Sequence, residues 1–342
     1  MARLFWCVIF GLGVASFAHG FPDPKDLPVF DSLGECIETV LPDVDPTMTV
    51  GEIEAECRTY MGKEEAEAKE QEYSAALERM AMERRTEWNP FVITPHQSNY
   101  LLPYSYMKKP NDDLYDDQIL DEGLDHAEAK LQISMKVPLY DRDLLVENDG
   151  IFFGFTLKAL WQVYNKKVSA PFRETNYRPE IYYFLPLRVI DEESNSAVAI
   201  GFEHESNGRS QPLSRSWNRI YLNYYYAKDN YLISFRPWYR VPEDEKNGPD
   251  DPKGDDNPDI YKYMGYFELS GTWEQNDYEF SLMLRNNLNS PNYGAIQLDA
   301  SFPIWGRVRG VVQYFNGYGE SLIDYNHRVN RLGFGILLTE ML

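Results

Sequence analysis

The stretch that decides the fold alternates apolar side chains with small or charged ones, and it reads Val198-Ala199-Ile200-Gly201-Phe202-Glu203-His204-Glu205-Ser206. Side chains two positions apart lie on the same face of a strand, so His204 and Ser206 share a face with the apolar residues Ile200 and Phe202. A second stretch of the same kind reads Asn218-Arg219-Ile220-Tyr221-Leu222-Asn223-Tyr224. In it, Asn218 lies on the apolar face. The two stretches therefore predict strands whose apolar faces carry a histidine, a serine and an asparagine.

The same alternation continues from about residue 89 to the end of the chain. Apolar residues occupy every second position in runs such as Leu131, Ile133, Met135 and Val137; Tyr278, Phe280, Leu282 and Leu284; and Leu332, Phe334, Ile336 and Leu338. At about ten residues per strand plus turns, roughly 250 residues provide about twelve strands. We therefore predict an all-β fold, an antiparallel transmembrane β-barrel formed by residues 89–342.

Composition favours a barrel over an antiparallel sandwich, in which the apolar face of a strand would simply belong to a core. The chain is 15% aromatic and contains 25 tyrosines, yet its mean hydropathy is −0.50. Aromatic girdles around a barrel with a polar interior explain that combination. The last alternating run also reaches the C-terminus, as is common in outer-membrane barrels, although Leu342 stands where an aromatic residue is usual.

The N-terminal segment indicates export. Residues 1–20 contain a basic residue, an apolar run and a small-residue cleavage site, as in a secretory signal peptide. Elsewhere no run of about eighteen apolar residues occurs, so we expect no helical membrane span. Residues 21–88 are acidic and helix-prone. We expect them to form a short periplasmic extension without chemistry of its own, in which Cys36 and Cys57 are bridged.

The charged residues argue against nucleic acid as a partner and against a metal site built around His204. The net charge is −21, whereas a phosphate backbone attracts basic proteins. Residues 241–256 are rich in aspartate and glutamate, and there we expect a solvated loop rather than a dedicated cation site. Glu203 and Glu205 flank His204, but alternation sends both to the opposite face of the strand.

His204, Ser206 and Asn218 are the residue types that nucleophilic hydrolysis of an ester needs. A serine hydroxyl is a poor nucleophile until an imidazole accepts its proton, and the imidazole needs a third group to fix its tautomer. An asparagine in that third role costs less to hold beside lipid than a carboxylate would. The turn that contains Gly208 offers backbone N–H groups to stabilise the oxyanion. The three residues therefore predict acyl-ester hydrolysis at a lipid-facing surface.

Four segments form an ordered set of motifs along the chain. They are the motif from His204 to Asn218, Pro171-Phe172-Arg173-Glu174-Thr175-Asn176-Tyr177, Asp256-Asn257-Pro258-Asp259-Ile260-Tyr261-Lys262-Tyr263-Met264-Gly265-Tyr266, and Gly317-Tyr318-Gly319-Glu320-Ser321-Leu322-Ile323-Asp324-Tyr325-Asn326. Together they resemble the Gram-negative outer membrane phospholipase A family. The resemblance implies a twelve-stranded barrel with a Ser-His-Asn site on its outer face. It also implies calcium-dependent cleavage, by a dimer, of sn-1 and sn-2 acyl esters of phospholipids and lysophospholipids.

The resemblance further implies where calcium would bind. The backbone carbonyls of Arg209 and Ser214 would come from one chain, and Ser169 would come from its partner. Calcium prefers such oxygen ligands and can polarise an ester carbonyl. Leu157 occupies the position of a polar residue at the family's dimer interface, so we expect a homodimer with a more apolar interface.

Two other functions fit parts of the pattern. A porin or structural barrel would share the fold, but it would need an open polar lumen and gives no reason to place His204 and Ser206 outward. A soluble, secreted β-sandwich esterase would stay in solution without detergent. Cell fractionation distinguishes the soluble esterase from a membrane barrel. An assay of fatty-acid release, with calcium and with chelator, distinguishes the phospholipase from a porin or structural barrel.

Overall fold

The computed structural model forms two compact units, Met1–Glu72 and Tyr73–Leu342. The residues whose structure is described are 22, 30, 32–61, 75–86, 89, 92–112, 123–140, 143–146, 148–167, 169–187, 195–248, 251, 253–306, 308–339 and 341–342. The predicted signal peptide, residues 1–20, lies outside them, and so does part of the helix-prone segment, residues 62–74. The division after Glu72 precedes the predicted start of the barrel at residue 89.

The described part of the first unit contains two short helices joined by a disulfide. They are α1 (Leu33–Val40) and α2 (Val50–Met61), with the 3-10 turn η1 (Leu41–Asp43) following α1. Ser32 caps α1 by accepting a hydrogen bond from the backbone N–H of Glu35. Cys36 and Cys57 are bonded to each other, as predicted, and their side chains are buried in the small apolar core between the helices.

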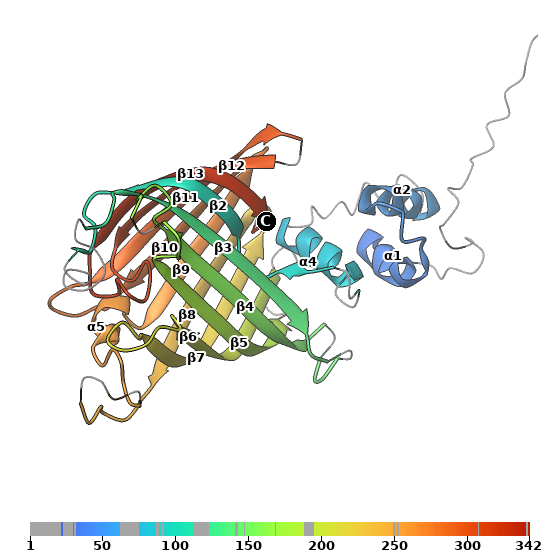
Figure 1. Ribbon diagram of the computed structural model, residues 1–342. Coiled ribbons are helices and arrows are strands. Elements are labelled where there is room, and N and C mark those ends of the chain that lie inside the picture. Colours follow the sequence, from blue (N-terminus) through green and yellow to red (C-terminus); the bar gives the residue numbers. More distant parts are fainter. Residues whose placement is uncertain are drawn as a thin grey trace, which may run out of the picture. The chain divides into compact units, whose positions relative to one another are not determined.

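The second unit, as far as it is described, is a closed antiparallel barrel of twelve strands (Figure 1), which confirms the predicted fold. Each strand pairs with its neighbours in sequence, and β13 pairs with β2 to close the sheet. The strands are β2 (Asn99–Met107), β3 (Ala127–Pro138), β4 (Gly150–Trp161), β5 (Glu174–Leu187), β6 (Asn195–Ser206), β7 (Ser216–Lys228), β8 (Tyr231–Val241), β9 (Phe267–Gln275), β10 (Tyr278–Asn286), β11 (Gly294–Trp305), β12 (Val308–Gly317) and β13 (Val329–Thr339). A short strand, β1 (Thr94–Pro95), pairs with β3.

Alternation along the strands produces an apolar outer face and a polar inner face. On β6, Ile200 is 52% exposed and Phe202 is 48% exposed, whereas Glu203 is fully buried. On β7, Ile220 and Leu222 are exposed in the same way. A sandwich would bury these apolar side chains, so their exposure is typical of a barrel that contacts lipid. None of the helices among the described residues is both long and apolar enough to cross a membrane.

Ion pairs fill the barrel interior. Lys130 donates to Glu320 at 2.9 Å, and Glu320 also accepts from Arg331 at 2.8 Å. Glu128 accepts from Arg331 at 2.6 Å and from Arg173 at 2.9 Å. All five side chains are almost completely buried. Buried charges of this kind survive only when they are paired, and here each charge has a partner of opposite sign.

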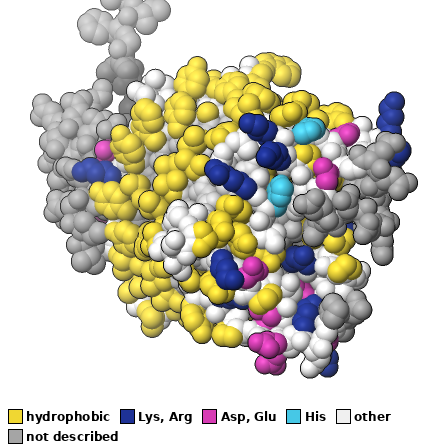
Figure 2. Space-filling model, turned by 90° about the vertical axis from the view of Figure 1, so that its left-hand side faces the viewer, with side chains coloured by type: hydrophobic (Ala, Val, Ile, Leu, Met, Phe, Trp, Pro, Cys, Tyr) yellow, Lys and Arg dark blue, Asp and Glu magenta, His cyan; other side chains and the backbone are white. Residues whose placement is uncertain are grey.

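The two ends of the barrel differ in the length of their connections. At one end, two-residue turns join β7 to β8 and β9 to β10. Helix α4 (Ala75–Thr86) lies at this end, where Ala75 donates its N–H to the Asp229 carbonyl at 2.9 Å. At the other end the connections are long, and one of them contains helix α5 (Ile260–Met264). Figure 2 views the long-loop end, where charged side chains gather beside the hydrophobic flank of the barrel.

Candidate active site

The hairpin of β6 and β7 positions the three predicted catalytic side chains. His204 and Ser206 lie at the end of β6, and Asn218 lies at the start of β7, directly opposite His204. All three side chains are partly exposed, while their neighbours Glu203 and Arg219 are buried inside the barrel. The three polar groups are therefore on the apolar outer face, at the end of the barrel that carries the long loops.

His204 and Asn218 form a hydrogen bond that determines the imidazole tautomer. The His204 Nδ1 atom lies 2.9 Å from Asn218 Oδ1. An amide oxygen can only accept, so the proton is assigned to Nδ1 and Nε2 is left as the basic nitrogen. Within the described residues no hydrogen bond joins Ser206 to His204, although the two lie on one strand face. Catalytic hydrogen bonds often shorten only when substrate is bound.

The Asn218 amide has a second partner, which the sequence pattern does not indicate. Its Nδ2 atom donates to Oε1 of Glu243 at 3.0 Å. Glu243 lies just beyond the end of β8, in the acidic loop that the sequence predicts to be merely solvated. Burial raises the pKa of the Glu243 carboxyl, and the nearby Asp255 raises it further. This carboxylate is therefore part of the site rather than of a free loop.

Asn207 organises the loop between β6 and β7. Its buried side chain accepts from the backbone N–H of Arg209 at 3.3 Å and of Arg215 at 3.0 Å. The same amide donates to the Leu213 carbonyl at 2.8 Å. One side chain thus holds both ends of the loop that the sequence motif contains. A lone asparagine in a polar stretch of sequence gives no signal of this role, because the role depends on how the loop folds.

Gly208 has a conformation that requires glycine. Its φ is +64°, and a Cβ atom there would lie 3.3 Å from the ring of Tyr177. Gly208 follows Ser206 by two residues, so the predicted oxyanion donor lies at the start of the β6–β7 loop, close in sequence to the predicted nucleophile. Its role as a donor stays a prediction.

The oxygen atoms around Ser214 suit a hard cation. The Ser214 hydroxyl donates to Asp256 Oδ2 at 2.5 Å, and Gln211 and Lys246 donate to Oδ1 of the same carboxylate at 2.6 and 2.5 Å. Burial raises the pKa of Asp256, but hydrogen bonds from Lys246, Ser214 and Gln211 outweigh it and leave the pKa lowered. An ionised carboxylate, a hydroxyl and backbone carbonyls are ligands that calcium accepts.

The chain's own cations compete for these oxygens. The Ser214 carbonyl accepts from Arg215 Nη1 at 2.6 Å, which leaves one lone pair of that oxygen for a metal but places a cation beside it. The described part of the chain contains no cluster of three or more His, Cys, Asp or Glu side chains placed to hold a metal. The donor set that the sequence resemblance implies consists instead of the carbonyls of Arg209 and Ser214 and a contribution from Ser169.

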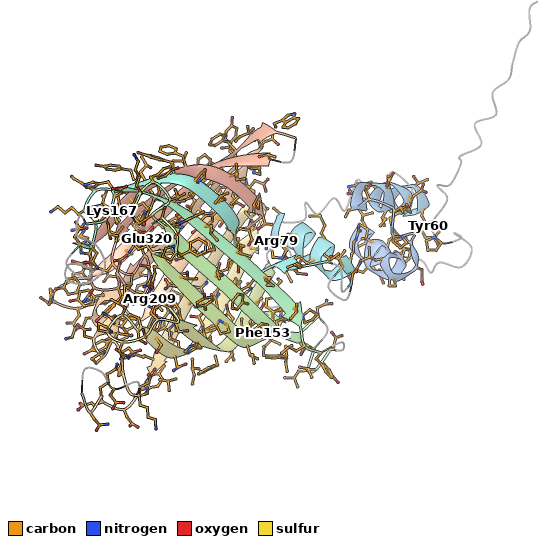
Figure 3. The ribbon with its side chains drawn as sticks, viewed as in Figure 1. Tyr60, Arg79, Phe153, Lys167, Arg209 and Glu320 are labelled. Atoms are coloured by element: carbon orange, nitrogen blue, oxygen red, sulfur yellow. A yellow bond between two sulfur atoms is a disulfide. The ribbon has the colours of Figure 1, made fainter. Side chains whose placement is uncertain are left out.

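The other two predicted calcium ligands lie in long loops. Arg209 is anchored by its side chain, which bonds Glu174 Oε2 at 3.3 Å and the Arg173 carbonyl, and Figure 3 shows it at the loop end of the barrel. Ser169 lies in the connection between β4 and β5, and its carbonyl accepts from Trp161 Nε1 at 2.7 Å. Both assignments stay predictions.

The inner faces of the same two strands carry a charged network. Arg219 donates to Glu203 and, at 3.2 Å, to Glu205. Its guanidinium lies 3.9 Å above the centre of the Trp217 ring. The indole N–H of Trp217 donates to Glu205 at 2.9 Å. The two carboxylates that flank His204 in sequence are thus engaged inside the barrel, as alternation predicts, and do not share a site with it.

A closed barrel with an apolar outer surface and a serine, histidine and asparagine on that surface defines a class, the membrane β-barrel hydrolases. The phospholipase A1 family model matches residues 77–338. Phospholipase A1 of Klebsiella pneumoniae is 38% identical over 260 residues, which cover 74% of this chain and 84% of the relative. Phospholipase A1 of Escherichia coli K12 is 37% identical, with coverage of 74% and 83%. The chain belongs to the phospholipase A1 family.

Solved structures agree with this assignment. Outer membrane phospholipase A from Escherichia coli is 37% identical, with a TM-score of 0.67 and coverage of 75% of this chain and 95% of that one. The Salmonella typhi outer membrane phospholipase, a dimer with bound calcium, is 36% identical with the same TM-score and covers 74% and 95%. The predicted family, hydrolase class and outer-membrane localisation are confirmed.

Proposed function

We propose that this chain hydrolyses acyl esters of phospholipids and lysophospholipids, at the sn-1 and sn-2 positions, from within the outer membrane. The observation that carries the proposal is the 2.9 Å contact between His204 and Asn218 on the outer apolar face, with Ser206 two residues away. An acyl chain lying along the barrel would bring its ester to the height of these groups. Phospholipid is therefore the substrate whose geometry suits the site.

Ser206 acts as the nucleophile and His204 as the base. As the Ser206 oxygen attacks the ester carbonyl, its proton passes to Nε2 of His204. The tetrahedral intermediate then collapses, and the same proton goes to the departing glycerol oxygen. A water molecule, deprotonated by His204, then attacks the acyl carbon; the bond to the Ser206 oxygen breaks, that oxygen takes the proton back from His204, and the fatty acid leaves. Throughout, Asn218 Oδ1 holds the Nδ1–H and keeps Nε2 turned towards the reacting atoms.

The negatively charged oxygen of the tetrahedral intermediate requires hydrogen-bond donors or a cation, and the loop that follows Ser206 could supply them. The Gly208 N–H would donate to that oxygen, since this residue lies two positions after Ser206, at the start of the β6–β7 loop. A calcium ion held by the carbonyls of Arg209 and Ser214, when bound, would add charge that stabilises the same oxygen. The Asp256 carboxylate lies beside Ser214, where it accepts from the Ser214 hydroxyl at 2.5 Å and pairs with Lys246 at 2.5 Å.

The relatives support both calcium and dimerisation. The Salmonella typhi protein is described as a dimer with bound calcium, and one Escherichia coli structure is an active-site mutant in which asparagine is replaced by alanine. We propose the same ion, the same assembly and the same role of Asn218 here, with Ser169 reaching the partner's calcium. A second barrel would supply the wall that a flat outer face lacks for holding an acyl chain.

The test replaces the nucleophile. Ser206→Ala should abolish fatty-acid release from detergent-dispersed phospholipid and labelling by a sulfonyl fluoride. Ser196→Ala is the matched control, because it removes a hydroxyl from a buried position of the same strand. Both proteins should still migrate differently before and after boiling on a detergent gel, which reports a folded barrel. Labelling that persists in Ser206→Ala would contradict the assignment.

A further inference from the structure

The side-chain amide of Asn218 is held from both sides. Its Oδ1 faces the His204 Nδ1 at 2.9 Å, and its Nδ2 donates to the Glu243 carboxylate at 3.0 Å. His204 comes from β6, Asn218 from β7, and Glu243 from the loop after β8. Two adjacent strands of the barrel wall and the loop after the next strand therefore contribute to one chain of hydrogen bonds that leads away from Ser206.

A carboxylate can hold an amide in only one orientation. The oxygen and the nitrogen of an asparagine side chain have nearly the same size, so sterics alone do not choose between them. An ionised carboxylate only accepts hydrogen bonds, and it therefore pairs with the NH₂ group. If the Asn218 amide turned over, its oxygen would face Glu243 and that hydrogen bond would be lost, and its NH₂ would face His204, where it could donate only to an Nδ1 that carries no proton.

The same carboxylate supplies a charge that Asn218 lacks. The imidazole of His204 becomes cationic when it takes the serine proton, and a neutral amide stabilises that cation less than a carboxylate would. A hydrogen bond to a charged acceptor polarises the amide and strengthens its bond to His204. Glu243 places the charge one residue further from the catalytic histidine, in a loop beyond the apolar strand face.

The loop around Glu243 is fixed by its own contacts. Arg240 bonds both carboxylate oxygens of Asp255 at 2.6 Å, and the Asp255 N–H donates to the Asp244 carbonyl at 2.8 Å. The nearby cation of Arg240 is thereby engaged by Asp255. Among the described residues, the side chain that hydrogen-bonds the Glu243 carboxylate is that of Asn218.

We propose that Glu243 is a positioning residue that orients Asn218 and, through it, the base His204. The inference rests on the proposed Ser206–His204–Asn218 mechanism. Glu243 would be a fourth residue beside Ser206, His204 and Asn218, and it would act on the reacting atoms only through Asn218. Its effect should appear in the rate of the chemical step and not in the binding of lipid.

The experiment compares Glu243→Ala and Glu243→Gln with Glu245→Ala, a matched control that removes an exposed carboxylate from the same loop. With phospholipid in mixed micelles, Glu243→Ala should lower kcat about tenfold, the effect of one charge-assisted hydrogen bond, and leave KM unchanged. Glu243→Gln keeps an accepting oxygen and should retain more of the rate. Glu245→Ala should match the wild type.

A double-mutant cycle separates positioning from a general effect on the loop. In an Asn218→Ala background, Glu243→Ala should cause no further loss of kcat, since the amide that it orients is gone. An equal loss in both backgrounds would overturn the proposal. A wild-type kcat for Glu243→Ala, or a Glu243→Gln variant no better than Glu243→Ala, would also overturn it. If the proposed mechanism itself failed, the wild type would instead show no Ser206-dependent activity.

Discussion

The two faces of strand β6 carry polar groups that differ in charge and in the number of their partners. On the outer face, His204 has a single hydrogen bond to a neutral amide. On the inner face, one residue earlier, Glu203 is fully buried and is bonded by Arg219 and, at 2.7 Å, by Arg236. The side that faces lipid thus uses uncharged groups, and the side that faces the interior uses paired ions.

Each arrangement suits the surroundings of its face. A charge beside hydrocarbon is costly, so a neutral Ser-His-Asn set is the cheaper way to place a nucleophile there. A buried ion pair is tolerated when every charge has a partner. Removal of one partner leaves the other charge buried and unpaired, which destabilises the fold. If His204 and Ser206 act as proposed, catalysis and stability are separated at a spacing of one residue along this strand.

The largest effect should follow removal of the base. His204→Ala should lower kcat by roughly 10⁵- to 10⁶-fold, the range seen when a base that acts with its nucleophile is deleted. The variant should remain a folded barrel, because its inner-face neighbours are untouched. Fatty-acid release and the gel shift on boiling measure the two quantities. Loss of the folded form would mean that the outer face also carries stability.

Asn218→Ala should be less damaging than His204→Ala. Its proposed role is to orient the imidazole, and water or a neighbouring group can partly replace it. We expect about a 10³- to 10⁴-fold loss of kcat, measured in the same assay. An effect as large as that of His204→Ala would show that orientation is too modest a description, and no effect would remove Asn218 from the site.

Calcium and dimerisation should be coupled. If Arg209 and Ser214 bind the ion with help from Ser169 of a partner, then calcium, substrate and dimer each favour one assembled state. Chelation should shift the protein in micelles towards monomer and weaken substrate binding by about 5- to 150-fold. Sedimentation in detergent, tracked with activity across calcium concentrations, measures this. Full specific activity from a demonstrated monomer would contradict it.

Much of the fold could be predicted because alternation is a local property. The β6 stretch alone shows which side chains face outward, and the same rule puts His204, Ser206 and Asn218 on one face from the sequence alone. Helix α4 falls within the predicted extension, however, although it packs on the barrel. Its docking depends on contacts such as that of Glu83 with Lys136 at 2.7 Å, which join residues distant in sequence.

The partners of the site could not be predicted for the same reason. Glu243 and Asp256 lie in an acidic stretch whose composition indicates only a solvated loop. Each becomes specific when the loop folds back on the hairpin, placing Glu243 on Asn218 and Asp256 on Ser214. Asn207 likewise gains its role from a turn that closes on its side chain. Long-range contacts of this kind carry no periodic signal in the sequence.

On the inner face, the loss of one ion should affect stability more than chemistry. Arg219→Met leaves Glu203 with one cation fewer and should lower the free energy of unfolding by about 3 kcal/mol. Arg328→Met is the control, since Arg328 is exposed and bonds Asn316 at 3.0 Å. Urea midpoints from the gel shift give the comparison. Sulfonyl fluoride labelling of the folded fraction should persist. Loss of labelling would show that the ion pairs of the inner face also support the reactivity of Ser206 on the outer face.

The smallest effect should come from Glu205, which lies between His204 and Ser206 in sequence but points inward. Its carboxylate accepts from Trp217 at 2.9 Å and from Arg219 at 3.2 Å, and a glutamine oxygen at the same place could still accept both bonds. Glu205→Gln should therefore cost about 1 kcal/mol of stability, because it weakens one charged hydrogen bond without leaving a buried group unpaired. Its kcat should stay within about twofold of the wild type, as the substitution changes no group on the outer face. The measurement is kcat at saturating phospholipid beside a urea midpoint. A large loss of kcat at unchanged stability would show that Glu205 takes part in the reaction. The inner face of β6 would then contribute to catalysis, and the proposed division of roles between the two faces would be wrong.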